Sequence, residues 1–332
     1  MVAITNQRPQ IRRVRTLLWL LLWVLVLGAV VVNQQRLVDW WKLRDYTPSS
    51  QIIRVADVAQ FTDKAEHLFF VNKPEVLSGQ SFTRECPIGA EKTVVLGCYK
   101  GGDNGIFLYE VSDVRLQGVV EVTAAHEMLH AAYERLSSKE RNRVDGLLNQ
   151  YFATGLQDDR LKKTIELYRE TEPTELANEM HSIFATEVRD LPAELEAYYR
   201  RYFTDRKGLV TLTENYQAEF TNRRSQVAAY DTQLADIKRT IETLQVQLAD
   251  EKRTLESKQT EMQSLRESGN TVGYNAMVPS YNALVSGYNA RIESLRSQIA
   301  SYNDIVEKRN ALALEERQLT QALSAEQLPT AK

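Results

Sequence analysis

The sequence predicts an α+β domain that is preceded by one N-terminal transmembrane helix and followed by an α-helical coiled-coil hairpin. Three observations indicate this fold class: an uncharged apolar run near the N-terminus, a middle region in which β-rich segments precede helix-forming ones, and heptad spacing in the last third. The chain has 332 residues and a formal net charge of -3, so it is long enough for one or two domains and lacks the basic surplus typical of nucleic-acid binding. We expect a cytoplasmic basic tail at 1–15, the transmembrane helix at 16–33, a linker at 34–52, the α+β domain at 53–208, an antiparallel coiled coil at 209–326 and a tail at 327–332.

The apolar run near the N-terminus covers residues 16–32 and contains neither a charged residue nor proline. Its length is at the short end of what spans a bilayer as a helix. A cleaved signal peptide is the alternative, but the run is longer than a usual signal core and no A-x-A-like site follows it. Basic residues precede the run, which favours a cytoplasmic N-terminus and an extracytoplasmic remainder. These basic residues are Arg8, Arg12, Arg13 and Arg15.

Cys86 and Cys98 are the two cysteines of the chain. Their spacing is too long for a CxxC metal site, and there is no third or fourth cysteine to complete one. The two cysteines can form a disulfide if the domain lies outside the cytoplasm, although spacing alone does not establish the geometry that a disulfide needs. The sequence leaves both the bridged and the free state possible.

The middle region starts with β-forming segments. Residues 92–100 and 105–111 are both rich in β-formers, and a Gly-Gly-Asp-Asn sequence separates them, which predicts a hairpin. The segment 116–122 then leads into a stretch with the composition of a helix, for which Thr123 is a candidate N-cap or first-turn residue.

That helix contains the sequence His126-Glu127-Met128-Leu129-His130. Two histidines four residues apart project from one helical face, so both imidazoles can reach one metal ion, and imidazole nitrogen suits zinc. Glu127 can reach a water molecule at such a site and act as the general base of hydrolysis. The alternative is an ordinary amphipathic helix with two structural histidines. The uncharged residues around them favour a buried helix beneath a cleft.

The residues from Thr123 to Ala132 resemble the extended zinc-binding helix of the zincin metallopeptidases. The resemblance implies a zincin-like fold, in which this helix lies beside a sheet whose edge strand holds the substrate backbone. Tyr133 and Leu136 occupy positions where metzincins carry their glycine and third histidine. The resemblance therefore implies a gluzincin-like plan, in which a glutamate on a later helix completes the zinc site.

The third ligand is expected from the segment 174–187, which predicts one helix after Pro173. Glu179 is the first choice, because its surroundings resemble the glutamate helix of several gluzincins. Glu175 lies one turn earlier on nearly the same face, and it has an acidic residue four places later, as the resemblance would favour. His181 is the third candidate and would give a three-histidine site.

Other polar and aromatic residues receive no role from the sequence. Tyr198, Tyr199 and Tyr202 could donate to an oxyanion, but aromatic residues at this spacing more often pack a helix. His67 is interpreted as structural.

Heptad spacing begins near residue 212 and predicts the core seam of a coiled coil. Gly269 and Gly273 interrupt it, and a second heptad segment follows with tyrosines seven residues apart. This arrangement favours an antiparallel hairpin over a parallel coiled coil between chains, with a turn that extends to about Pro279. The apolar residues of the first segment are Tyr230, Leu234, Ile237, Ile241, Leu244 and Leu248.

Together these features predict a zinc-dependent endopeptidase that is tethered to a membrane and acts on a peptide or protein outside the cytoplasm. Zn²⁺ would be bound by His126, His130 and Glu179, and the coiled coil would bind a protein partner or a second copy. The alternative is a non-enzymatic, membrane-anchored scaffold or binding protein. The presence of Glu127 favours the enzyme, since a domain without chemistry has no need of it.

Overall fold

The computed structural model describes residues 8–87, 95–102 and 105–324. The chain divides into two compact units: the first contains residues 1–112, 117–214 and 324–332, and the second contains residues 113–116 and 215–323. The expected tail at 327–332 and the first seven residues of the expected basic tail lie outside the described residues.

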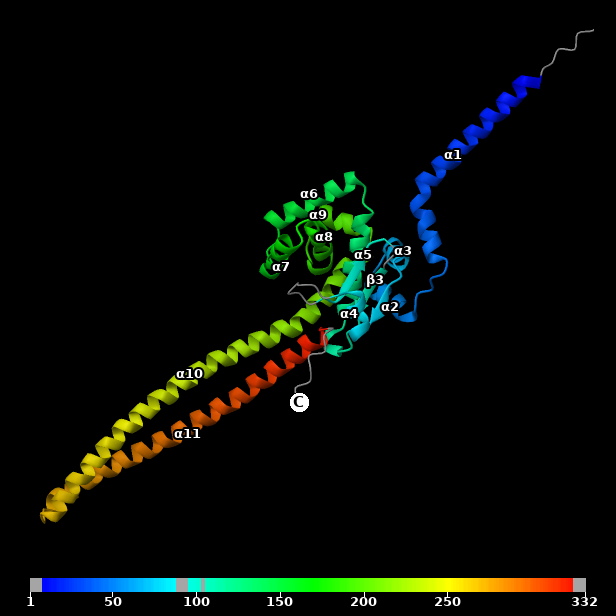
Figure 1. The fold of residues 1–332 in the computed structure, drawn as a ribbon. Coiled ribbons are helices and arrows are strands. Elements are labelled where there is room, and N and C mark those ends of the chain that lie inside the picture. Colours follow the sequence, from blue (N-terminus) through cyan, green and yellow to red (C-terminus); the bar gives the residue numbers. More distant parts are fainter. Residues whose placement is uncertain (1–7, 88–94, 103–104, 325–332) are drawn as a thin grey trace, which may run out of the picture. The chain divides into compact units, whose positions relative to one another are not determined.

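The first unit is built mainly from helices around a small sheet (Figure 1). Its elements in chain order are α1 (Arg8–Leu43), α2 (Ser50–Val58), α3 (Asp63–Val71), β1 (Glu75–Leu77), α4 (Gly79–Glu85), β2 (Gly97–Lys100), β3 (Gly105–Tyr109), α5 (Val119–Glu134), α6 (Ser138–Thr154), α7 (Asp159–Thr171), α8 (Leu176–Glu187), α9 (Ala193–Tyr199) and the start of α10 (Arg206–Glu267).

The sheet has the strand order β1-β3-β2, with β3 in the centre. β3 pairs in parallel with β1 and antiparallel with β2, and Cys98 lies opposite Phe107 in the second pairing. The predicted hairpin is therefore present, whereas β1 has no counterpart in the sequence analysis. α5 packs against both β2 and β3, and it buries Met128 and Leu129 completely. β2 is thus the edge strand that lies against the helix carrying the histidine motif.

The fold class expected from the sequence is wrong in two respects. The described chain is predominantly helical with three short strands, so it does not form an α+β zincin-like domain. The β-rich segments contribute only four or five residues each to the sheet. Residues 114–116 form a 3₁₀ turn, and α5 already begins at Val119.

The second correction concerns the expected transmembrane helix. Among the described residues, no single helix is long and apolar enough to cross a membrane. Leu18–Val31 and Asn33–Leu43 satisfy the criteria of length and composition only as a pair, and the chain bends by 63° between them.

The C-terminal half of α1 is connected to the other helices of the first unit by a buried carboxylate. Asp39 accepts hydrogen bonds from Nη1 and Nη2 of Arg135 at 2.9 and 3.0 Å, and it lies 3.2 Å from Nε2 of His67. Arg135 directly follows α5, and His67 belongs to α3, so Asp39 joins three helices. His67 thus makes a contact between helices, and it lies apart from the histidine motif.

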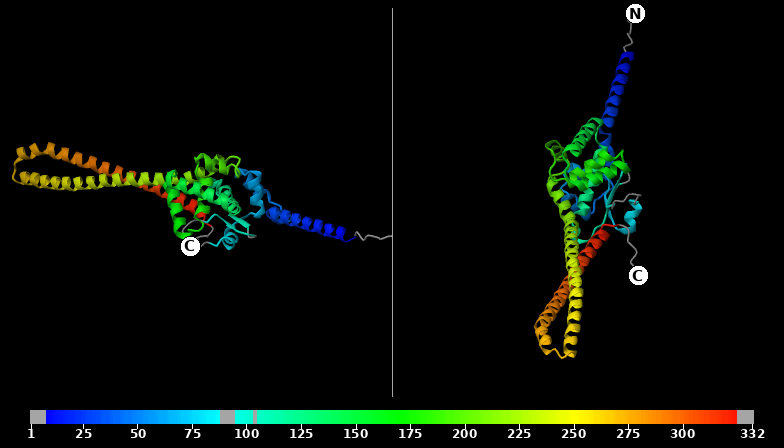
Figure 2. Two further views of the ribbon diagram at one scale, coloured as in Figure 1. Left: turned by 90° about the horizontal axis from the view of Figure 1, so that it is seen from above. Right: turned by 90° about the vertical axis from the view of Figure 1, so that its left-hand side faces the viewer.

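The second unit is a hairpin of two long helices, the remainder of α10 and α11 (Thr271–Ala322), with a 3₁₀ turn η1 (Val114–Leu116). The helices run side by side in both further views (Figure 2). Cross-helix ion pairs establish the antiparallel direction, because the partner in α11 moves back along the chain as the residue in α10 moves forward. These pairs are Arg223–Glu315, Arg224–Glu316, Asp231–Arg309 and Glu251–Arg291.

The turn of this hairpin is tighter than the sequence suggests. Gly269 has a φ of +74°, and the Asn270 side chain caps α11 by accepting a hydrogen bond from the backbone of Gly273. The expected extension of the turn to Pro279 is wrong, because Pro279 lies inside α11. Pro279 removes one backbone hydrogen bond, and α11 continues on both sides of it.

Candidate metal centre

Helix α5 presents the two motif histidines. The helix starts at Val119, and its N-cap is Gly118, whose φ of +94° favours glycine. Thr123 is therefore inside the helix, and its hydroxyl donates to the Val119 carbonyl at 2.8 Å instead of capping. His126 and His130 lie one turn apart, with ring centroids separated by 4.8 Å. The i, i+4 spacing thus brings the two imidazoles together, as expected.

Helix α8 supplies the third side chain of the group, Glu179. Its Oε2 lies 3.5 Å from Nε2 of His126, and its Oε1 lies 3.6 Å from Nε2 of His130. One potential ligand atom from each of the three residues lies within 4.8 Å of the others. Burial raises the pKa of the Glu179 carboxyl, but the neighbouring imidazoles outweigh burial and hold it below its ordinary value. The carboxylate is therefore ionised at neutral pH.

The donor set fits a metal ion. The distances from Glu179 to the histidines are too long for good hydrogen bonds, and its Oε2 is buried without a hydrogen-bond partner. A buried carboxylate oxygen without a partner is costly, and a cation between the three side chains would remove that cost. Two imidazoles and one carboxylate are common ligands of divalent transition metals. His126, His130 and Glu179 can thus hold a metal ion together.

Glu127 projects from α5 toward the edge strand. The residue is 7 % exposed, and burial raises the pKa of its carboxyl to about 7, although nearby His130 and the backbone N–H of Tyr99 act in the opposite direction. Strand β2 approaches it so closely that a Cβ on Gly97 would lie 3.0 Å from Cγ and from Oε1 of Glu127. The carboxylate therefore lies between the helix and the strand, beside the three potential ligands.

The two other candidates for the third ligand do not join the group. Glu175 is the N-cap residue of α8, and its Oε2 accepts a hydrogen bond from Asn178 at 3.2 Å. His181 is fully buried, and its Nε2 lies 2.9 Å from the hydroxyl of Tyr198. Burial lowers the pKa of His181 to about 3, with a contribution from the two motif histidines, so the ring is neutral. Of the three candidates, the structure places Glu179 at the histidines.

The tyrosines after α8 form a buried cluster around His181. Tyr199 donates from its hydroxyl to the His181 carbonyl at 2.8 Å, and the hydroxyls of Tyr198 and Tyr202 lie 3.5 Å apart. All three tyrosines are at most 3 % exposed. They pack α9 against α8, as aromatic residues at this spacing most often do, and they hold the helix that carries Glu179.

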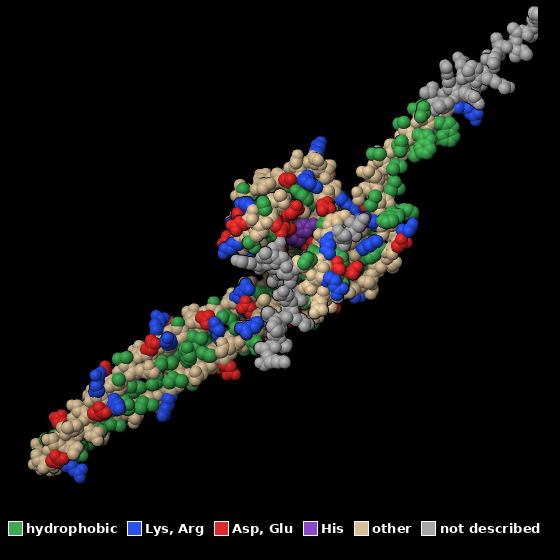
Figure 3. All heavy atoms as spheres, in the orientation of Figure 1, with side chains coloured by type: hydrophobic (Ala, Val, Ile, Leu, Met, Phe, Trp, Pro, Cys, Tyr) green, Lys and Arg blue, Asp and Glu red, His purple; other side chains and the backbone are tan. Residues whose placement is uncertain are grey.

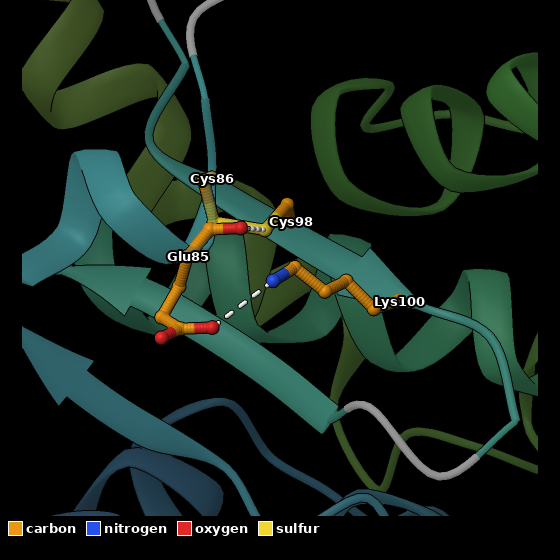
Figure 4. The surroundings of a disulfide bond; sticks show 4 residues. All are labelled: Glu85, Cys86, Cys98 and Lys100. Atoms are coloured by element: carbon orange, nitrogen blue, oxygen red, sulfur yellow. Dashed lines mark hydrogen bonds and ion pairs between the residues drawn. A yellow bond between two sulfur atoms is a disulfide. The ribbon is translucent and has the colours of Figure 1, made fainter.

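The structure contains a disulfide between Cys86 and Cys98, whose Cα atoms lie 5.9 Å apart (Figure 4). Cys86 is the C-cap residue of α4, and Cys98 lies in β2. A second link also joins β2 to α4, because Lys100 donates to Glu85 at 3.0 Å. The edge strand beside Glu127 is therefore connected to α4 both covalently and by an ion pair.

Several residues that shape the site have no signal in the sequence. Gly97 and Tyr99 contact Glu127 from a strand about 30 residues upstream, and Arg206 binds the C-terminal end of α8 from α10. Such contacts join segments that are distant in the sequence. Only the β-rich composition before the motif could have indicated that a strand lies close to α5.

Histidine side chains are visible at the surface of the first unit beside acidic side chains (Figure 3). The side chain of His126 is 21 % exposed, so the group can exchange an ion or a ligand with solvent. Comparisons of the chain with protein-family models, with curated proteins and with solved structures found no match.

Proposed function

We propose that the chain is a zinc-dependent peptidase. The single observation that carries the proposal is the convergence of His126, His130 and Glu179, with the carboxylate of Glu127 next to them. The resemblance of the residues around the motif to the zinc-binding helix of the zincin metallopeptidases adds to this, although the overall fold differs from the expected one.

Zinc is the metal that we assign to the three side chains. Three protein ligands with a remaining open position are typical of catalytic zinc, and two histidines with a glutamate are a common set. When bound, zinc supplies Lewis-acid polarisation of a carbonyl group and lowers the pKa of water. Glu179 contributes a negative charge that balances half of the charge of the ion.

Glu127 is the general base of the proposed reaction. It is not part of the ligand group, so its carboxylate is available to take a proton from the attacking water and to return it to the leaving amine. The close approach of Gly97 limits the movement of this carboxylate, and the backbone of Tyr99 lies near enough to lower its pKa. These two contacts orient the base without a further charged group.

Strand β2 is the proposed binding edge for a peptide. Tyr109 donates from its backbone to the Leu96 carbonyl, so Gly97 and Tyr99, which alternate with the bonded positions, direct their backbone groups away from β3. An extended peptide could pair with such an edge, and this would bring a backbone carbonyl toward the metal. Peptides and proteins are therefore the substrate class that we propose.

We also propose that the protein works outside the cytoplasm at a membrane. A structural disulfide is typical of an oxidising compartment. The apolar side chains of Leu18–Val31 are exposed, and lipid is the environment that such side chains prefer. The hairpin of α10 and α11 would bind a protein partner or a second copy, since it contributes no residue to the metal group.

The test compares Glu127→Gln with wild type on a peptide library, at equal zinc content. General-base catalysis contributes about 100-fold to 10,000-fold, so the variant should lose at least 100-fold in kcat while it keeps its zinc. Glu170→Gln removes a carboxylate from the exposed face of α7 and serves as the matched control. A Glu127→Gln protein that cleaves peptides as fast as wild type would contradict the proposal and favour a non-enzymatic, ligand-binding role.

A further inference from the structure

Strand β2 approaches Glu127 at Gly97 and at Tyr99, which are two residues apart. A Cβ on Gly97 would lie 2.5 Å from Cγ2 of Thr123 and 3.0 Å from the Glu127 carboxylate, so the strand and the helix are at their closest here. Two residues later, the backbone N–H of Tyr99 lies close enough to the same carboxylate to lower its pKa. The residue between them is Cys98, which forms the disulfide. The position of Glu127 therefore depends on the position of β2.

Strand β2 packs on α5, where the Tyr99 hydroxyl donates to Glu134 at 2.7 Å, and it has few further attachments. It is an edge strand of four residues, and β3 is its one partner in the described part of the sheet. The disulfide attaches it to Cys86 at the end of α4, where Cys86, Phe82 and Phe107 form a small buried core. The ion pair of Lys100 with Glu85 follows the same path, but both side chains are about one-third exposed, so it contributes little. Besides the pairing with β3 and the contacts with α5, the covalent link is thus the main restraint on the strand.

We propose that the Cys86–Cys98 disulfide is a positioning element for the general base: it holds β2 against Glu127, and its loss slows hydrolysis while metal binding persists. The inference rests on the proposed function. The two consequences separate because the ligands are carried by α5 and α8, whereas the disulfide joins α4 to β2. A displacement of a catalytic group by about 1 Å can cost about 100-fold in rate, so a small movement of the strand is sufficient.

The test uses the full-length, zinc-loaded chain with both cysteines replaced, Cys86→Ala/Cys98→Ala. Lys100→Met is the matched control, because it removes the ion pair on the same path and leaves the disulfide in place. Three quantities are measured: bound zinc, kcat on a peptide substrate, and hydrogen exchange of the Tyr99 amide. The last reports the contact with Glu127 without any catalysis.

We expect the double variant to keep one zinc per chain, to lose about 100-fold in kcat and to exchange the Tyr99 amide at least about 10-fold faster. Lys100→Met should behave as wild type. Should the double variant fail to fold, reduction of folded wild type with a phosphine, which does not compete for zinc as a dithiol does, should give the same losses. Reoxidation should then reverse them.

Unchanged amide exchange and kcat in the absence of the disulfide would overturn the proposal. A parallel loss of zinc and kcat would also overturn it, because the disulfide would then support the whole metal centre instead of the base. Wild type that binds zinc and protects the Tyr99 amide but cleaves no peptide would contradict the proposed function. The exchange measurement would still decide whether the disulfide holds the strand against Glu127.

Discussion

Arg206 offers the sharpest test of how the helix that carries Glu179 is held in place. Its guanidinium is buried at the C-terminal end of α8, where it donates to the carbonyls of Ala185 at 3.1 Å and Val188 at 2.5 Å. Further donations go to the Arg189 carbonyl at 2.7 Å and to the Glu196 carboxylate at 2.7 and 3.1 Å. Carbonyls at a helix end have no partner within the helix, so one arginine satisfies this end of α8.

Replacement of this side chain by methionine, Arg206→Met, keeps most of the apolar stem and removes these donations. Loss of one partner of a buried ion pair costs about 3–5 kcal/mol. We expect the free energy of unfolding to fall by about 3 kcal/mol, at the lower end of that range. The Glu196 side chain is 23 % exposed, so water can partly replace its partner. With a urea dependence of about 2 kcal/mol per molar, the unfolding midpoint of the first unit should fall by about 1.5 M.

Near-ultraviolet circular dichroism is the suitable assay, because it follows the buried tyrosines of the first unit and is insensitive to the helical content of the second. Lys207→Met is the matched control: Lys207 is the next residue, and its ion pair with Asp190 is largely exposed. The control should unfold within error of wild type. If Arg206→Met and Lys207→Met unfold at the same midpoint, the assignment of Arg206 as the cap of α8 is refuted.

Two further predictions concern the edge strand and the buried carboxylate of α1. Gly97→Ala should lower the rate of peptide hydrolysis at least 10-fold without loss of zinc, because the new Cβ displaces Glu127. In the control Gly146→Ala the new Cβ meets no atom within 4 Å, so the rate should be unchanged. Equal rates for both variants would refute the close approach of Gly97 to Glu127. Burial raises the pKa of Asp39, but its hydrogen bonds, above all those from Arg135, lower it below the ordinary value. The ionised form therefore stabilises the fold above the ordinary pKa, and this stabilisation is lost as the pH falls through the lowered one. The urea midpoint of Asp39→Asn should therefore fall less than that of wild type as the pH is lowered. The same dependence of the midpoint on pH in both proteins would contradict this.

The parts of the site that lie within one helix could be predicted from the sequence. The spacing of His126 and His130 determines that both face the same side, since helical geometry repeats every 3.6 residues. Glu179 was chosen by a family resemblance, and the structure brings it to the histidines, whereas Glu175 and His181 bind elsewhere. Local periodicity likewise predicted the two antiparallel helices of the second unit.

Long-range packing accounts for what could not be predicted. The β-rich composition around residues 92–111 indicates strands, but it does not show that they end after four or five residues or that β1 adds to them in parallel. The bend in α1 and the helical start of α5 are likewise absent from the pattern, so the expected fold class was wrong. Arg206, Gly97 and Asp39 act through partners far away in the chain, and nothing in their local sequence indicates this.

The metal content of three purified proteins tests the central claim most directly. Wild type, Glu179→Gln and Glu175→Gln differ only in the carboxylates of the two glutamates on or next to α8, and zinc bound per chain is measured after dialysis against a weak chelator. We predict one zinc per chain for wild type and for Glu175→Gln, and strongly reduced zinc for Glu179→Gln. Wild type without stoichiometric zinc, or a Glu179→Gln protein that retains it, would contradict the assignment of His126, His130 and Glu179 as a metal centre.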